Sequence, residues 1–266
     1  MIPDFLAQAF SPDRWPTFVF LTARLGGMMT IAPLWSMTTL PKAARAAITV
    51  VLALALLPAC PPVHAPEETF DLLLPLALEG LVGLAIGLTA AVLVQGMAMA
   101  GEVVSLQMGL SLGPVLAPTP DVAVPGVAQL QTILALLVYA SLDGHLMLLK
   151  GLADSLRVLP PGSGFGLSGE AAPVVALLGT LFTCAVRAAA PVMVALLLAN
   201  LALAVLSRAV PQLNAMMVAF PITIGVGLIM IGASVPVMTG AMRGWTETLP
   251  AMAAAALRGF QPAGGP

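Results

Sequence analysis

The chain alternates between long apolar runs and short connections that hold most of its polar residues. Charge-free runs cover residues 46–63, 80–101, 122–142, 188–207 and 209–242. Each is about as long as the ~20 residues that cross the hydrocarbon core of a bilayer as a helix, or longer. The pattern therefore predicts an all-α integral membrane protein, or a subunit buried in an apolar assembly.

About six hydrophobic segments follow from this pattern, and we expect each to be helical. They cover residues 15–35, 43–57, 72–100, 127–150, 171–207 and 216–237, and a short Ala-rich helix is expected at 250–257. Pro191 lies in the middle of the fifth segment, where its ring clashes with the carbonyl four residues earlier. This proline predicts either a kinked long helix or a helical hairpin. Gly83 and Gly87 form a small-xxx-small face, which lets another helix approach closely.

The connection between the third and fourth segments, Gly101–Gly126, is too apolar for an ordinary surface loop. Its four prolines forbid a continuous helix, and only Glu102 and Asp121 are charged. Irregular apolar backbone is tolerated at membrane depth only where it is buried in protein or lines a cavity. We therefore interpret it as a loop that plugs or lines a pore, with a buried connection between helices as the alternative. Met108 is the expected part of a deformable seal, because thioethers adapt to changing partners.

The amino-acid composition, the net charge and the lack of catalytic motifs argue against several classes of function. Charged residues make up 8% of the chain and hydrophobic residues 59%, against roughly 25% and 45–50% in ordinary soluble domains. The net charge of −2 and the lack of a basic patch argue against a nucleic-acid partner. No nucleophile motif, phosphate loop or zinc-protease motif is present, so we expect no catalytic residue, no bound metal and no cofactor.

Ionisable residues inside the apolar segments are costly and are functional candidates by default. Five stand out in the sequence: Arg24, Glu79, Glu102, Asp143 and Arg187. One interpretation is a proton or ion relay. The other is ion pairing between helices or subunits, favoured by the near balance of arginines and carboxylates.

Residues Arg208–Asn214 (RAVPQLN) lie between the last two apolar segments and separate them. Pro211 disfavours a continuous helix, and Asn214 is a suitable N-cap for the helix that follows. We expect a hairpin turn formed by Arg208, Pro211 and Asn214. The stretch 161–170, rich in Gly and Ser, is predicted to be an exposed linker, and the C-terminal QPAGGP a flexible end.

Four stretches together resemble the FliR family of flagellar export-gate proteins, whose injectisome relatives serve virulence-type type III secretion. They are ARLGGMMTIAPLWSMTTLPKAARAAI (23–48), AGEVVSLQMGLSLGPVLAP (100–118), DGHLMLLKGLADSLRVLP (143–160) and LALAVLSRAVPQLNAMMVAFPITIGVGL (201–228). The combination in this order is specific, although any single stretch is weak. The run SLQMG is more similar to the flagellar branch.

The resemblance implies a subunit of the export gate in the bacterial inner membrane, at the flagellar basal body. It would form a pore with P-type and Q-type subunits, next to A-type and B-type export proteins, and pass unfolded secreted proteins. Kinked helical hairpins are expected, with a P-like portion at 1–160, a linker at 161–170 and a Q-like hairpin and tail at 171–266. The plug would span residues 106–122. Its seal would comprise Met108, Gly109, Leu110, Leu112, Gly113, Pro114 and Val115.

In that family the loop often carries aromatic residues, whereas aliphatic side chains stand in their place here. Three alternatives to a flagellar gate remain open at the level of sequence. A related injectisome subunit would share the resemblance. A secondary transporter would explain broken segments and buried charges, but it predicts inverted repeats that the sequence does not show. An intramembrane enzyme would need a convergent polar site.

Overall fold

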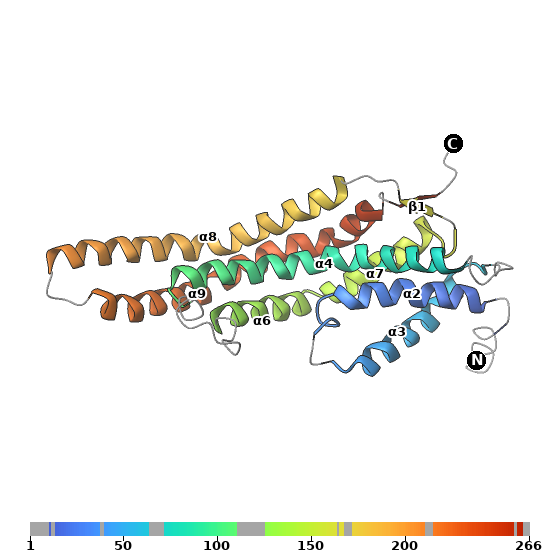
Figure 1. Ribbon diagram of the computed structural model, residues 1–266, viewed down its shortest axis with the longest axis horizontal. Helices are drawn as coiled ribbons and strands as arrows, with labels where there is room; N and C mark the ends of the chain where they lie inside the picture. The colour runs from blue at the N-terminus through green and yellow to red at the C-terminus, as the bar shows by residue number, and fades with distance from the viewer. Residues whose placement is uncertain are drawn as a thin grey trace. The chain divides into compact units, whose positions relative to one another are not determined.

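Figure 1 shows a computed structural model of the chain, which describes residue 11 and residues 14–37, 40–63, 72–110, 126–163, 165–167, 172–210, 215–257 and 260–262. Each of the six predicted apolar segments contains a helix, which confirms an all-α membrane protein. The helices are α2 (Trp15–Ile31), α3 (Lys42–Leu56) with the 3-10 turn η1 (Leu57–Ala59), α4 (Leu73–Gln107), α6 (Gly126–Ser141), α7 (Gly144–Val158), α8 (Ala172–Ala209) and α9 (Ala215–Ala256).

Four stretches of the described residues are long and apolar enough to cross a membrane: α3 with η1, α4, α8 and α9. A fifth is possible if α6 and α7 count as one span, although they are bent by 62° at the break between them. The apolar surface of α8 is suited to contact with lipid or other proteins, since only 17% of its most apolar window is buried by the chain itself. The chain is an integral membrane protein.

Two of the predicted segments, 72–100 and 127–150, have helix boundaries that differ from the sequence prediction. The segment 127–150 is two helices, because Asp143 adopts a left-handed conformation (φ 54°) just before Gly144. Short polar residues and glycine tolerate this conformation better than others, so the break falls there. Helix α4 continues past Ala100 to Gln107, which shortens the apolar loop at its start.

The last two helices also correct the prediction. Helix α8 runs for 38 residues through Pro191, so the first of the two interpretations, one long helix, is confirmed over a hairpin at that proline. Helix α9 runs for 42 residues and includes the predicted separate helix at 250–257 up to Ala256. Buried Met242, Leu249 and Ala253 recur along it at seven and four residues, so one apolar stripe continues through the polar stretch between them.

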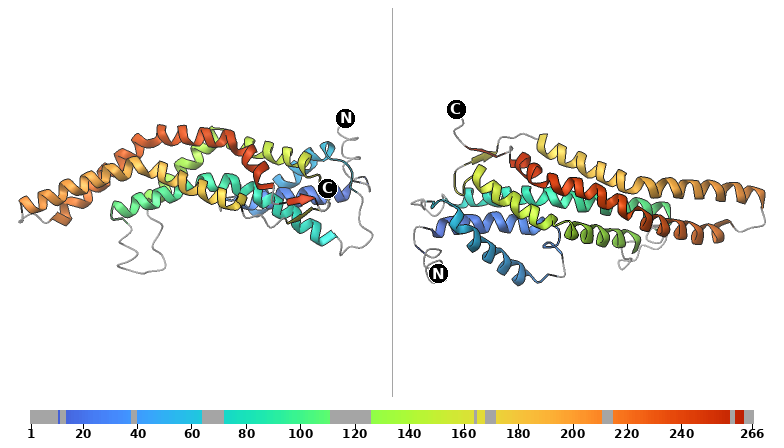
Figure 2. Two further views of the ribbon diagram at one scale, coloured as in Figure 1. Left: turned by 90° about the horizontal axis from the view of Figure 1, so that it is seen from above. Right: turned by 180° about the vertical axis from the view of Figure 1, so that it is seen from behind.

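The chain forms two compact units, each built from separate stretches of sequence. The first comprises Met1–Ala91, Asp143–Leu177 and Thr246–Pro266. It contains α2, α3, the first half of α4, α7 and the end of α9, and α2 packs against α3 (Figures 1 and 2). Its core includes Leu21, Leu25, Met28, Val82, Ile86, Leu148, Leu152, Leu249 and Ala253.

The second unit comprises Val92–Leu142 and Leu178–Trp245. It contains the second half of α4, α6, most of α8 and most of α9. Its core includes Leu93, Met97, Val104, Met108, Ala135, Tyr139, Cys184, Val192, Leu196, Met238 and Met242. These units interleave along the sequence, so they do not follow the division into 1–160, 161–170 and 171–266, which stays a prediction.

A short two-stranded sheet lies in the first unit. Strand β1 (Phe165–Leu167) pairs antiparallel with β2 (Phe260–Pro262), with Phe165 opposite Pro262. Part of the predicted linker is therefore paired with part of the tail that the sequence predicted to be flexible. Backbone hydrogen bonding across a strand pair satisfies polar groups that a free end would leave to water.

Candidate functional site

Helices α2 and α4 approach one another at glycines. A Cβ atom added to Gly83 would lie 1.8 Å from the carbonyl oxygen of Arg24, and one added to Gly27 would lie 2.1 Å from the carbonyl oxygen of Gly80. At Gly87 the nearest atom would be the carbonyl oxygen of Met28, at 2.7 Å. No larger residue is accommodated at these three positions without moving backbone, so the small-residue face of α4 has the role that its spacing predicted.

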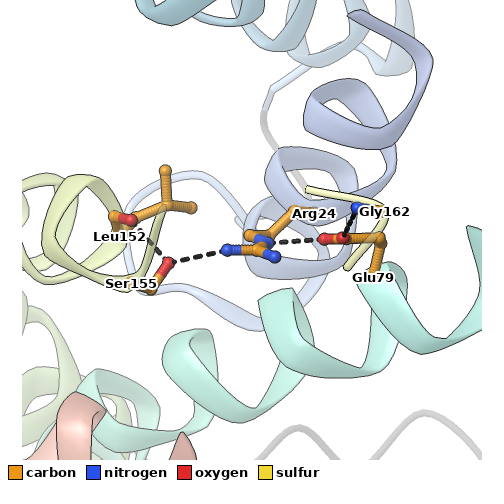
Figure 3. A network of polar contacts seen from close by, with 5 residues as sticks. All are labelled: Arg24, Glu79, Leu152, Ser155 and Gly162. Carbon is orange, nitrogen blue, oxygen red and sulfur yellow. Dashed lines mark hydrogen bonds and ion pairs between the residues drawn. The ribbon is translucent and has the colours of Figure 1, made fainter. Parts of the chain in front are cut away.

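This close contact encloses an ion pair between the two helices (Figure 3). The Nε–H of Arg24 donates to Glu79 Oε2 at 2.6 Å, and the two side chains are 0% and 1% exposed. The Arg24 Nη1 group donates to Ser155 Oγ at 3.2 Å. The Gly162 backbone N–H donates to the other carboxylate oxygen, Glu79 Oε1, at 3.0 Å.

The resulting polar cluster of Arg24, Glu79, Ser155 and Gly162 joins four parts of the first unit: α2, α4, α7 and the turn after α7. Ser155 Oγ also donates to the Leu152 carbonyl within its own helix, which fixes the hydroxyl oxygen as the acceptor for arginine. Both carboxylate oxygens of Glu79 have donors. This geometry supports the ion-pairing interpretation, because each oxygen of the carboxylate is occupied by a fixed donor rather than open to a proton path.

The other three ionisable candidates are not brought together. Glu102, Asp143 and Arg187 are exposed on this chain, and none forms an ion pair with another described residue. Pairing of these three residues between helices of this chain is therefore not seen among the described residues. Asp143 lies at the α6–α7 break, while Glu102 and Arg187 project from the outer faces of α4 and α8. Pairing with a neighbouring subunit stays a prediction for these residues.

The start of the predicted plug loop is anchored in the second unit. Met108 is 1% exposed, and a Cβ atom added to Gly227 of α9 would lie 2.7 Å from the Met108 sulfur. Thr223 Oγ1 donates to the Met108 carbonyl at 3.4 Å. Gly109 follows in a left-handed conformation (φ 78°), with the Phe220 ring 2.9 Å from where its Cβ would be. Here the positive φ and the ring both require glycine.

The rest of the predicted seal and turn is only partly described. Leu110 follows Gly109 at the end of the described stretch, and its N–H donates to the Ser105 carbonyl at 3.1 Å. Leu112, Gly113, Pro114 and Val115 lie outside the described residues. At the predicted hairpin turn, Arg208 is exposed near the end of α8, and α9 begins at Ala215. Pro211 and Asn214 lie outside the described residues, so the turn stays a prediction.

Sequence reasoning missed the groups that complete these contacts. Ser155 shares a helical face with buried Leu148 and Leu152, at spacings of seven and three residues, and a hydroxyl on that face was the available signal. Gly162 and Thr223 act through tertiary contacts that no local pattern encodes. Within the described stretches, no group of three or more His, Cys, Asp or Glu side chains is placed to hold a metal ion.

Comparisons with known proteins identify the family of the chain. The family described as bacterial export proteins, family 1, matches residues 15–249. The chain is 31% identical over 225 residues to the flagellar biosynthetic protein FliR of Escherichia coli K12, covering 84% of each chain. It is 30% identical over 224 residues to the FliR protein of Bacillus subtilis 168, covering 82% of this chain and 86% of that one. The match takes in every helix described above except the end of α9, and the chain therefore belongs to the FliR family of bacterial export proteins.

Proposed function

We propose that this chain is a subunit of the flagellar protein export apparatus. The observation that carries the proposal is the match to relatives named flagellar biosynthetic protein FliR, from organisms as different as Escherichia coli and Bacillus subtilis. It covers 84% of both chains for the first and 82% of this chain and 86% of the relative for the second. These names favour the flagellar branch over an injectisome. The role is structural rather than catalytic: the chain forms part of a path for other proteins in the inner membrane.

Within that apparatus, the chain forms the gate with P-type and Q-type subunits, beside A-type and B-type export proteins. The exposure of large apolar side chains along α8 and α9 is consistent with a chain that is embedded in lipid and packed against other subunits. Val186, Leu198 and Val205 are 65%, 62% and 70% exposed on α8, and Met217 and Ile229 are 77% and 72% exposed on α9. Apolar surface of this extent on a single chain is covered by lipid or by other subunits.

Residues 106–122 form the plug of the gate. The support is twofold: the loop is apolar with three prolines, at positions 114, 118 and 120, and its first residues are held by packing against α9. Met108 is buried within this chain, so we assign it the role of anchoring the plug beside Gly109. The side chains that seal the pore are then Leu110, Leu112 and Val115.

The function is tested by deleting the gene in its own organism and restoring it on a plasmid. We expect loss of motility and of secreted flagellar proteins in the culture medium, with both restored by the wild-type chain. An affinity tag on the restored chain should retrieve P-type and Q-type subunits from detergent-solubilised membranes. Normal flagellar secretion in the deletion strain would refute the export role.

The plug is tested separately by replacing residues 112–120 with a Gly-Ser stretch of equal length. This change keeps the chain length, so the complex should still assemble, but the membrane should become leaky to small ions. Leakage is measured as loss of membrane potential after induction, with the wild-type chain at equal abundance as the control. A tight membrane with the complex assembled, or loss of assembly, would contradict the plug.

A further inference from the structure

A cavity of about 310 Å³ opens between α2 and α3 in the first unit. Its apolar wall includes Gly26 and Met29 of α2 and Ala46 and Val50 of α3. Lys42 and Arg45, from the first turn of α3, also line the cavity. The volume is at the lower end of the ~300–1,000 Å³ typical of small-molecule sites, and the lining combines apolar surface with two cations.

Among the described residues, the two cations have no carboxylate to neutralise them. Helices α2 and α3 contain no acidic residue, and neither Lys42 nor Arg45 forms an ion pair with any described residue. Arg45 donates from Nη2 to the Met37 carbonyl at 3.2 Å, which positions the guanidinium. Its Nε atom is buried and has no hydrogen-bond partner in the described part of the chain. Arg45 as a whole is half-buried, and a ligand that supplies an acceptor for its Nε–H would bind favourably here.

The backbone adds further donors at the same end. The residue before α3 is Pro41, and no side chain of the described residues caps the helix. The first N–H groups of an α-helix have no acceptor within the helix and carry the positive end of its dipole. The first turn of α3 therefore presents free N–H groups beside Lys42 and Arg45, a combination that favours an anion.

The remaining wall of the cavity offers little to a polar ligand, because its two hydroxyl groups already donate within their own helices. The hydroxyl groups of Thr22 and Thr49 donate to the carbonyls of Phe18 and Arg45 in their own helices, at 2.8 and 2.9 Å. Helix α3 is long and apolar enough, with η1, to cross a membrane, and only 17% of its most apolar window is buried. The cations thus lie at the end of an apolar helix, where the interfacial region of a bilayer places lipid phosphates.

We propose that this cavity binds one anionic glycerophospholipid. Its phosphate would be held by Arg45, Lys42 and the first turn of α3, and the beginning of an acyl chain would lie against Gly26, Met29, Ala46 and Val50. The inference needs only the membrane location of the chain and is independent of the export role.

The test uses the full chain purified in detergent and titrated with phosphatidylglycerol, followed by native mass spectrometry. Phosphatidylcholine with the same acyl chains is the reference, because it has a phosphate but no net charge. We expect one phosphatidylglycerol per chain, bound at least about tenfold more tightly than phosphatidylcholine, because the choline ammonium group of the reference lipid is repelled by Lys42 and Arg45. Equal affinity for the two lipids would overturn the proposal.

Two independent variants locate the site. Lys42→Gln with Arg45→Gln removes the cations, and its control, Lys150→Gln with Arg157→Gln, removes the same charge from exposed positions on α7. Gly26→Leu fills the cavity without changing charge, since a Cβ atom at Gly26 meets nothing within 4 Å. Both test variants should lose the tight lipid while keeping wild-type helicity by circular dichroism, and the control should retain it. Tight binding that survives in either folded test variant would overturn the assignment.

Two further outcomes identify a different occupant. If millimolar inorganic phosphate displaces phosphatidylglycerol completely, the cavity is a site for free anions, and the lipid proposal is wrong. If the isolated chain binds the lipid but the chain retrieved with its partner subunits does not, a protein covers the cavity in the assembly. That result would also refute a resident lipid. Retention of one phosphatidylglycerol in the assembly would confirm it.

Discussion

Replacing Glu79 by alanine is expected to destabilise the first unit by ~3–5 kcal/mol, the usual effect of removing one partner of a buried ion pair. The structure supports the upper part of that range. Arg24 is 0% exposed, so its charge would have no carboxylate and no direct access to water. The Gly162 N–H would lose its acceptor as well. The loss is dominated by the uncompensated arginine, not by the attraction between the two charges.

A double-mutant cycle separates these two effects. Arg24→Met, Glu79→Gln and the double variant are compared by unfolding in mixed micelles of increasing sodium dodecyl sulfate, followed by circular dichroism. Each single variant leaves a polar partner behind and should be destabilised. The double variant should be less destabilised than the sum of the two, with a coupling of ~1–3 kcal/mol, because residues in direct contact do not act additively.

The matched control is Glu102→Ala, an exposed carboxylate on the same helix, which should change the free energy of unfolding by less than ~0.5 kcal/mol. If Glu79→Ala is as mild as Glu102→Ala, Arg24 must have access to water or to another acceptor. Strict additivity of the two single variants would likewise show that the 2.6 Å contact carries no interaction energy.

Three further pairs of substitutions test close contacts and positive-φ positions by the same unfolding assay. Gly83→Ala should destabilise by ~3 kcal/mol or more because it meets a backbone carbonyl, whereas Gly80→Ala, whose nearest contact is 4.0 Å away, should be neutral or stabilising by up to ~1 kcal/mol; equal effects would contradict the helix contact. Gly109→Ala should lose ~1–2 kcal/mol from its left-handed conformation, and Gly126→Ala, which meets nothing within 4 Å, is the comparison. Asp143→Gly should be tolerated better than Asp143→Ala, and the reverse order would argue against the positive φ at the α6–α7 break.

The helices that form in the long apolar segments were predictable from the hydropathy of the sequence. All six apolar segments contain helices, because a helix is the structure that satisfies its own backbone in an apolar environment. The small-residue face at Gly83 and Gly87 was predictable for the same local reason, as its spacing places both on one side of α4. The pairing of Arg24 with Glu79 followed from the cost of a lone buried charge, although sequence could not choose between the possible partners.

The errors arose where tertiary packing overrides local signals. Pro191 left a long helix and a hairpin equally open, and only the structure shows that α8 continues through it. The helix expected at 250–257 was predicted to be separate, yet it is the end of α9. Conversely, the helix break at Asp143 and Gly144 is not visible in the hydropathy pattern, because the segments on both sides of it are apolar. The pairing of β1 with β2 joins residues almost a hundred positions apart, so no periodicity within either stretch could reveal it.

The chain pairs two of its charged side chains within its own fold and leaves others exposed on its surface. Arg24 and Glu79 neutralise one another inside the first unit, and this pair can form before any partner binds. Arg187 and Glu102 remain exposed on helices whose other outward residues are largely apolar. In lipid, an unpaired charge of either sign is unfavourable, so these two positions favour surroundings that contain an opposite charge or water. Substituting Arg24 should therefore impair folding of the isolated chain, whereas substituting Arg187 should leave the isolated chain stable and reduce its recovery with other subunits. A destabilised isolated chain for Arg187→Ala would show that the residue serves its own fold after all.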